Sequence, residues 1–312
     1  MERKINMRAV DRFYEKRWGV FTHYLSGIYG CTTSEEWNAC VNSFDVHQLA
    51  KTLHEMGAGY YFITIMQGTR FMLAPNATYD SLFGAKPGEI CAERDLVLDL
   101  YEALEPYGID LYLYYTGDGP HLERQYGEKM GIQYEKQTCN GELLTDEFVR
   151  KWADVLREYS IRYGSKVKGW WLDGMYNYFG YHNEKMALYY DAVKAGNPDA
   201  ITAFNNGTGE AAISKWYEKE EFLCGEALDF ETIPKSRFVD GAQSHMLAPL
   251  GIENAGDWAG ARWAKPGARR DHAYMKDFID RYHAAGGVVT VDIRIESDGR
   301  LDPAQIAALT GI

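Results

Sequence analysis

Long apolar runs and paired cysteines are both missing from this chain of 312 residues. Its five cysteines are odd in number and include no Cys-x-x-Cys pair. This pattern argues against a disulfide framework or a zinc site and favours a reducing compartment. No apolar run reaches the roughly 20 residues that a membrane-spanning helix needs. The sequence therefore predicts neither a membrane-spanning protein nor a small disulfide-stabilised one.

An export signal is missing as well. The N-terminus reads Met1-Glu2-Arg3-Lys4 and is followed by no apolar stretch of the kind that secretory signals contain. We therefore expect a soluble cytoplasmic protein, or a periplasmic or secreted one if a signal has been removed from the N-terminus.

Excess positive charge and clustered histidines are also missing. The formal net charge is −12, so neither nucleic acid nor an anionic membrane surface is an expected partner. The eight histidines stand apart and include no His-x-His pair, so we expect no metal site, and no motif implies a cofactor. The oligomeric state is left open.

Aromatic residues are plentiful instead. The chain has 23 Tyr and 8 Trp, which is more than a core alone needs. Such rings present an apolar face and a polar edge, and a surplus of them suits a groove that contacts sugar rings. A tyrosine-rich core is the alternative explanation.

Segments of strand character alternate with helical segments along the chain. Strands are predicted over 18–25, 60–66, 109–116, 167–173, 200–205, 222–226, 244–250 and 287–295. Helices are predicted over 45–56, 93–107, 183–195 and 271–285, and two more begin after Thr145 and after Asp302.

Eight strands, most of them followed by a helix, predict one domain over residues 1–312, an α/β protein with a closed (β/α)8 TIM barrel. A doubly wound sheet would need a Gly-x-Gly-x-x-Gly turn after its first strand, and residues 26–30 do not match it. Two long connections, 70–92 and 117–144, follow the second and third strands. We expect both at the C-terminal face of the barrel, where substrate loops lie.

The strand predicted over 167–173 ends in an isolated acid, Asp173, directly after Trp170, Trp171 and Leu172. An ionised carboxylate is costly inside a buried strand. It is tolerated at the C-terminal end of a barrel strand, where catalytic residues are placed. A helix-capping Asp after an ordinary core strand is the other interpretation.

The ends of the other strands supply hydrogen-bonding and aromatic side chains. Amides, imidazoles and carboxylates exchange hydrogen bonds with hydroxyl groups, while rings stack on the C–H face of a sugar. We therefore predict one carbohydrate-binding pocket, lined by His23, Glu36, Trp37, Gln67, Tyr115 and Trp171.

The motifs of residues 17–310, taken in order, resemble the catalytic barrel of the α-L-fucosidases, a family of retaining glycoside hydrolases. Residues 19–24, Gly-Val-Phe-Thr-His-Tyr, are similar to the Phe-x-His-Trp-Gly motif of the family's first strand. Glu35-Glu36-Trp37 is similar to its Gly-Glu-Trp motif, and Arg94-Asp95-Leu96-Val97 to its Arg-Asp-Leu-Val motif. Trp171-Leu172-Asp173-Gly174 resembles the motif that carries its nucleophile.

The resemblance implies a retaining, exo-acting glycosidase for an α-L-fucoside-like sugar, with Asp173 as the nucleophile. Such enzymes need a second carboxyl group about 5–5.5 Å away as acid and base. In the family this residue comes from a poorly conserved stretch after the nucleophile. Glu226 fits best because it ends an apolar strand, and Glu231 and Asp240 are its rivals.

Two features depart from the family. After its second strand the family has a histidine pair that grips fucose, whereas this chain has Ile65-Met66-Gln67. The sugar is therefore expected to differ from fucose in stereochemistry or substituents, or the barrel is a non-catalytic sugar-binding protein or acts differently, for instance as a lyase. The chain also ends at Ile312, so we expect no C-terminal β-sandwich domain.

Overall fold

The computed structural model describes residues 7–136, 143–209, 213–252 and 262–312. The N-terminal residues that bear on export, Cys139 and part of the long connection over 117–144 lie outside these ranges. Among the described residues, no helix combines the length and the apolar character needed to cross a bilayer.

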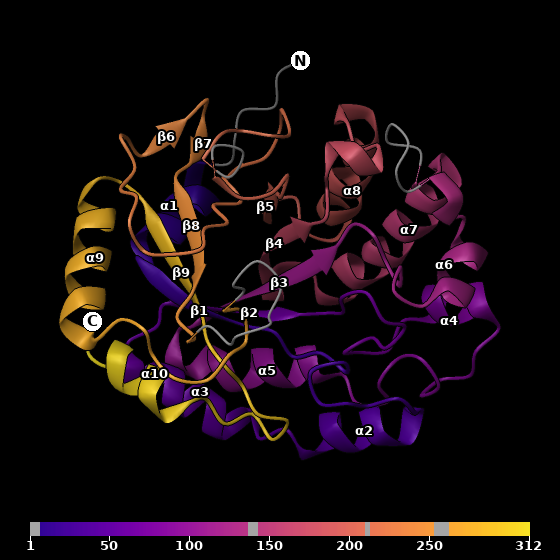
Figure 1. Ribbon diagram of the computed structural model, residues 1–312, viewed down its shortest axis with the longest axis horizontal. Coiled ribbons are helices and arrows are strands. Elements are labelled where there is room, and N and C mark those ends of the chain that lie inside the picture. Colours follow the sequence, from indigo (N-terminus) through magenta and orange to yellow (C-terminus); the bar gives the residue numbers. More distant parts are fainter. Residues whose placement is uncertain (1–6, 137–142, 210–212, 253–261) are drawn as a thin grey trace.

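Seven parallel strands form the central sheet (Figure 1). Their spatial order is β5 (Ile201–Phe204), β4 (Val167–Asp173), β3 (Asp110–Thr116), β2 (Tyr60–Thr64), β1 (Trp18–Thr22), β9 (Val288–Asp292) and β8 (His245–Pro249). Each lies within a strand predicted from the sequence, and β4 has the predicted bounds. The fold is of the (β/α)8 TIM-barrel type, as expected.

An irregular segment, residues 221–227, occupies the eighth position between β5 and β8. The backbone N–H of Phe222 donates to the carbonyl of Thr202 in β5. On the other side, Ala227 N–H donates to the carbonyl of Leu247 in β8, 2.9 Å away. The strand predicted over 222–226 is therefore no continuous ladder. Single backbone hydrogen bonds join this segment to β5, and isolated bridges join it to Gln243 and to Leu247 of β8.

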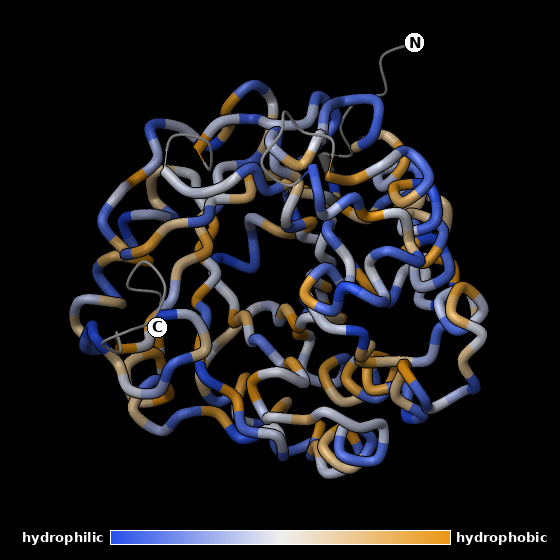
Figure 2. Tube along the Cα trace, turned by 45° about the vertical axis from the view of Figure 1, so that its right-hand side comes forward, coloured by the Kyte–Doolittle hydropathy of each residue, from blue (hydrophilic) through white to orange (hydrophobic). Residues whose placement is uncertain are grey.

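Helices surround the sheet, and hydrophilic and hydrophobic residues alternate along them (Figures 1 and 2). The predicted ones are α3 (Val46–Met56), α5 (Leu96–Leu104), α7 (Asp146–Tyr163), α8 (Asn183–Gly196), α9 (His272–Ala284) and α10 (Pro303–Leu309). Thr145 and Asp302 cap α7 and α10 through their side chains, as predicted. The helix predicted over 93–107 begins at Leu96 and ends in a 3-10 turn.

Several short elements were not predicted. They are α1 (Met7–Glu15), α2 (Ser34–Ser43), α4 (Ala77–Phe83), α6 (Arg124–Met130) and the hairpin of β6 (Phe238–Val239) and β7 (Ala242–Gln243). Helix α1 inserts Phe13 among the barrel's inward-facing rings, with its centroid 5.0 Å from Tyr60 and 5.3 Å from Tyr112. Because these tyrosines lie at the beginnings of β2 and β3, α1 fills the N-terminal end of the barrel.

Candidate active site

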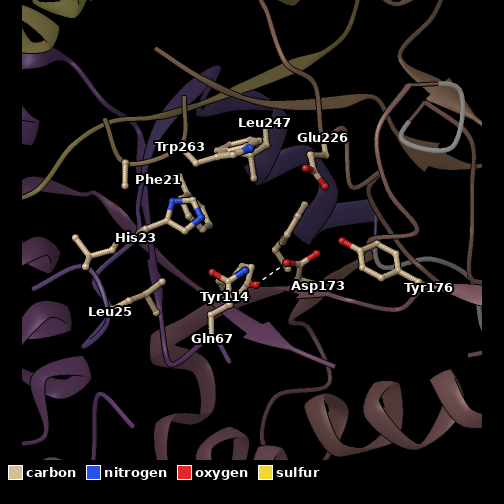
Figure 3. A pocket seen from close by; sticks show the side chains of 13 residues that line it. Phe21, His23, Leu25, Gln67, Tyr114, Asp173, Tyr176, Glu226, Leu247 and Trp263 are labelled. Atoms are coloured by element: carbon tan, nitrogen blue, oxygen red, sulfur yellow. Dashed lines mark hydrogen bonds between the residues drawn. The ribbon is translucent and has the colours of Figure 1, made fainter. Parts of the chain in front are cut away.

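A cavity of about 360 Å³ opens at the C-terminal ends of the strands (Figure 3). Its polar wall is formed by His23, Gln67, Asp173 and Glu226. Its aromatic wall is formed by Phe21, Tyr114, Trp171, Tyr176 and Trp263. Figure 3 shows Asp173 and Glu226 on one side of the cavity and His23 on the other. Five of the residues predicted from the sequence therefore meet here: His23, Gln67, Trp171, Asp173 and Glu226.

Asp173 is the last residue of β4, and Gly174 turns the chain away immediately with a φ of +66°. The Tyr114 hydroxyl donates to Asp173 Oδ2 over 2.5 Å, and the Asn205 amide donates to Oδ1 over 2.7 Å. Burial raises the pKa of Asp173, while the hydrogen bonds from Tyr114 and Asn205 act in the opposite direction. Both oxygens of this carboxylate are thus held by donors that favour its ionised form.

Glu226 shares one of these donors. Asn205 Nδ2, 2.7 Å from Asp173 Oδ1, lies 2.6 Å from Glu226 Oε2. These two carboxylate oxygens are therefore at most about 5.3 Å apart, because the two distances cannot add to more. That limit agrees with the separation of about 5–5.5 Å in retaining glycosidases and is shorter than the roughly 6.5–9.5 Å of inverting ones.

The two carboxyl groups differ in their protonation. Burial, and next the charge of Asp173, raise the pKa of Glu226 to about 7. Glu226 accepts one hydrogen bond from Asn205, whereas Asp173 accepts from two side chains. When one proton is shared by such a pair, it resides on the carboxyl with the weaker stabilisation of its charge. The pair therefore offers an ionised Asp173 beside a protonated Glu226.

His23 is held by an acid that the sequence analysis did not select. Its Nδ1 lies 2.7 Å from Oδ1 of Asp292, the last residue of β9. Asp292 is buried and also accepts from the backbone N–H of Ala264 over 2.8 Å. The signal in the sequence was an acid inside the apolar strand predicted over 287–295, where an ionised carboxylate is as costly as at Asp173.

Tyr115 does not line the cavity, contrary to prediction. Its hydroxyl donates to the backbone carbonyl of Trp152 in α7, 2.8 Å away. Successive side chains of a strand point to opposite faces, so Tyr114 faces the barrel interior and Tyr115 faces the helices. The tyrosine of β3 that lines the cavity is the preceding one, Tyr114.

Glu36 and Trp37 were also wrongly assigned to the pocket. Both lie in α2, where Glu36 is exposed and accepts from the backbone of Thr33, completing a capping box. Trp37 is buried in the core, and its indole N–H donates to the carbonyl of Met72 over 2.8 Å. Glu36 therefore stabilises the start of α2, and Trp37 joins α2 to the connection that follows β2.

The rivals of Glu226 lie away from the cavity. Glu231 is exposed, and its carboxylate is 3.4 Å from the Arg270 guanidinium. Asp240 is an exposed residue of the turn between β6 and β7, with a φ of +49°. Neither lines the cavity, so the geometry favours Glu226 as the partner of Asp173, although its catalytic role stays a prediction.

The described residues contain no group of three or more His, Cys, Asp or Glu side chains arranged to hold a metal ion. The site can instead supply a carboxylate, a carboxylic acid, an imidazole and a primary amide around one small volume.

A family model described as alpha-L-fucosidase matches the chain over residues 1–312. The chain belongs to the α-L-fucosidase family. No curated protein matches it.

Among solved structures, the chain is similar to a bacterial fucosidase in complex with a dihydroxy-methylpyrrolidine inhibitor. That pair has 18% identity and a TM-score of 0.66, covering 99% of this chain and 72% of the other. An endo-fucoidan hydrolase of glycoside hydrolase family 107 has 15% identity and a TM-score of 0.72, and the match covers 97% of this chain and 63% of the other. The third structure is a GH29 α-L-fucosidase from Bacteroides thetaiotaomicron, trapped as a covalent intermediate with 2-fluoro-fucosyl fluoride. It has 16% identity and a TM-score of 0.66, and the match covers 99% of this chain and 74% of the other. At these identities the likeness shows the shared fold.

Proposed function

We propose that this member of the α-L-fucosidase family is a retaining, exo-acting glycosidase for an α-L-fucoside-like sugar, with Asp173 as nucleophile and Glu226 as acid and base. The observation that carries the proposal is the pair of unequal carboxyl groups that share Asn205 Nδ2 at one end of the cavity. The covalent intermediate trapped in a GH29 relative supports the same chemistry.

In the first step Asp173 attacks the anomeric carbon while Glu226 donates its proton to the glycosidic oxygen. The bond to the leaving group breaks, and a glycosyl–Asp173 ester forms. In the second step the Glu226 carboxylate takes a proton from water, whose oxygen attacks the anomeric carbon and releases Asp173. Both carboxyls return to their starting states, and the product keeps the anomeric configuration of the substrate.

The size and lining of the cavity suit a single terminal sugar. Its volume of about 360 Å³ lies near the lower end of the range of small-molecule sites, roughly 300–1,000 Å³. His23 and Gln67 can exchange hydrogen bonds with hydroxyl groups, and Trp263 offers an aromatic face. Because Gln67 follows β2 where the family resemblance implies a histidine pair, we expect hydroxyl recognition to differ from that of fucose itself.

The test is hydrolysis of a panel of aryl glycosides that includes the α-L-fucoside and the α-L-galactoside, with the first-formed anomer followed by NMR. Retention of configuration is expected, as is a loss of several orders of magnitude in turnover for Asp173→Ala with an unchanged fold. A product of inverted configuration, or full activity in a folded Asp173→Ala variant, would contradict the mechanism. A fucoidan oligosaccharide separates exo from endo action by the size of its products.

A further inference from the structure

Asn205 is bound tightly to the strand that carries Asp173. It follows β5, and its side chain is completely buried. Its backbone N–H donates to the carbonyl of Leu172 over 2.8 Å, and its carbonyl accepts from the N–H of Met175 over 3.0 Å. These two bonds flank Asp173 on both sides, so the Asn205 backbone and the carboxylate keep a fixed relative position.

The side-chain amide of Asn205 is fully used. Its Oδ1 accepts from the backbone N–H of Gly207 over 2.9 Å. This bond identifies the oxygen of the amide, so the other end is the nitrogen, Nδ2. An amide nitrogen has two hydrogens. The nearest acceptors of this one are Asp173 Oδ1 at 2.7 Å and Glu226 Oε2 at 2.6 Å.

We propose that Asn205 is a positioning residue that fixes the separation of Asp173 and Glu226 and stabilises the negative charge on each in turn. This inference rests on the glycosidase function proposed above. In the free enzyme the charge is on Asp173; once the ester has formed, Asp173 is neutral and Glu226 carries the charge. Because Nδ2 is bonded to both groups, the same amide serves both states without moving, as preorganised donors do.

A positioning role has a signature in the pH dependence. A hydrogen bond to an ionised carboxyl lowers its pKa, and the bonds from Asn205 lower the pKa values of both Asp173 and Glu226. Removing the amide should therefore raise both pKa values. The acidic and the basic limb of the activity profile should both move to higher pH.

The experiment compares Asn205→Ala with Asn206→Ala in the chain of 312 residues. Asn206 is the same residue type one position later, and its side chain accepts from the backbone N–H of Asn177 instead, 3.3 Å away. For Asn205→Ala we expect kcat on an activated aryl glycoside to fall about 100-fold and both limbs to rise by about one pH unit. For Asn206→Ala we expect the wild-type profile.

A second variant tests the proposal if Asn205→Ala does not fold, and a second measurement tests it if the variants are inactive. Asn205→Asp keeps the volume but adds a third carboxyl group, so its limbs should shift at least as far. Carboxyl titrations followed by ¹³C NMR report the Asp173 and Glu226 pKa values without substrate.

The proposal is overturned if the limbs and the carboxyl titrations of folded Asn205 variants match those of the wild type, whatever their activity. If the wild type hydrolyses no glycoside of the panel, the proposed function fails, while unchanged or shifted titrations still decide the role of Asn205.

Discussion

The imidazole of His23 and the carboxylate of Asp292 form a pair, with Nδ1 of His23 2.7 Å from Oδ1 of Asp292. The buried acid joins the first strand of the barrel to the last one, because β1 and β9 are neighbours in the sheet. Binding at Nδ1 fixes the orientation of the ring and leaves Nε2 for the cavity.

We therefore expect Asp292→Asn to weaken sugar binding without unfolding the barrel. A charged hydrogen-bond partner of His23 is lost while the volume is kept, so kcat/KM should fall about 10- to 100-fold. If His23 only binds the sugar, this fall in kcat/KM should come mainly from an increase in KM. Steady-state kinetics with circular dichroism as a folding control check this, and unaltered kinetics would show that His23 is oriented by other contacts.

The activity should depend on pH through Glu226. Because its pKa is about 7 and the first step needs its proton, kcat/KM should fall about tenfold per pH unit above that value. Glu226→Ala should lose most activity on substrates with poor leaving groups, keep it on activated aryl glycosides and regain rate with azide. Rate profiles against pH measure the first effect. A basic limb that persists in Glu226→Gln on an activated substrate would assign the limb to another group.

The same carboxyl makes stability depend on pH. Its folded pKa of about 7 lies above the ordinary value of 4.5, so the native state binds more protons than the unfolded state between these values. The free energy of unfolding should fall as pH rises from about 4.5 to about 7, by on the order of 3 kcal/mol at most. Denaturant titrations of the wild type and of Glu226→Gln isolate this contribution, since the variant lacks the titrating group.

Two adjacent tyrosines provide a matched pair. Tyr114→Phe removes a donor to Asp173, so the pKa of Asp173 and the acidic limb should rise and kcat should fall about tenfold or more. Tyr115→Phe removes only a bond to the Trp152 carbonyl, so it should cost about 1 kcal/mol of stability and leave the kinetics unchanged. Kinetics and thermal unfolding of both variants test this. Equal loss of activity in the two would contradict the alternation of faces along β3.

Cys31 and Cys40 are expected to form a disulfide on oxidation, although their spacing in the sequence gave no hint of it. Their sulfur atoms lie 3.3 Å apart. Burial raises the pKa of the Cys31 thiol to about 12, so reaction with glutathione disulfide should be slow near neutral pH. Thiol titration of the unfolded wild type should show two thiols fewer after oxidation than before it. Cys40→Ser should show no such loss. Closing this short loop should raise the stability by about 2–3 kcal/mol.

The sequence predicted the barrel well because its evidence is local. Strand β4 needs only its own apolar run and the Asp173-Gly174 end to be located, and the caps Thr145 and Asp302 identify their helices by themselves. Helix α1 was missed because its two core residues, Val10 and Phe13, stand among charged neighbours, and only the open end of a barrel gives them a place to be buried.

The site was predicted less completely because it depends on contacts between elements. Thr33 and Glu36 have the spacing of a capping box, which could have assigned Glu36 to a helix terminus. The choice between Tyr114 and Tyr115 required the phase of one strand relative to the barrel axis. The roles of Asn205 and Asp292 require the register of several strands at once, and no single segment of the sequence contains it.

The irregular segment over residues 221–227 has a consequence for related chains. Asp173 stands on a strand that is paired on both sides, so moving it along the chain would disrupt two ladders. Glu226 stands on a segment held by isolated bridges, where an insertion or deletion can relocate an acid without disrupting a ladder. In related chains, counting strands should locate the proposed nucleophile, whereas the proton donor has to be found by its distance in space.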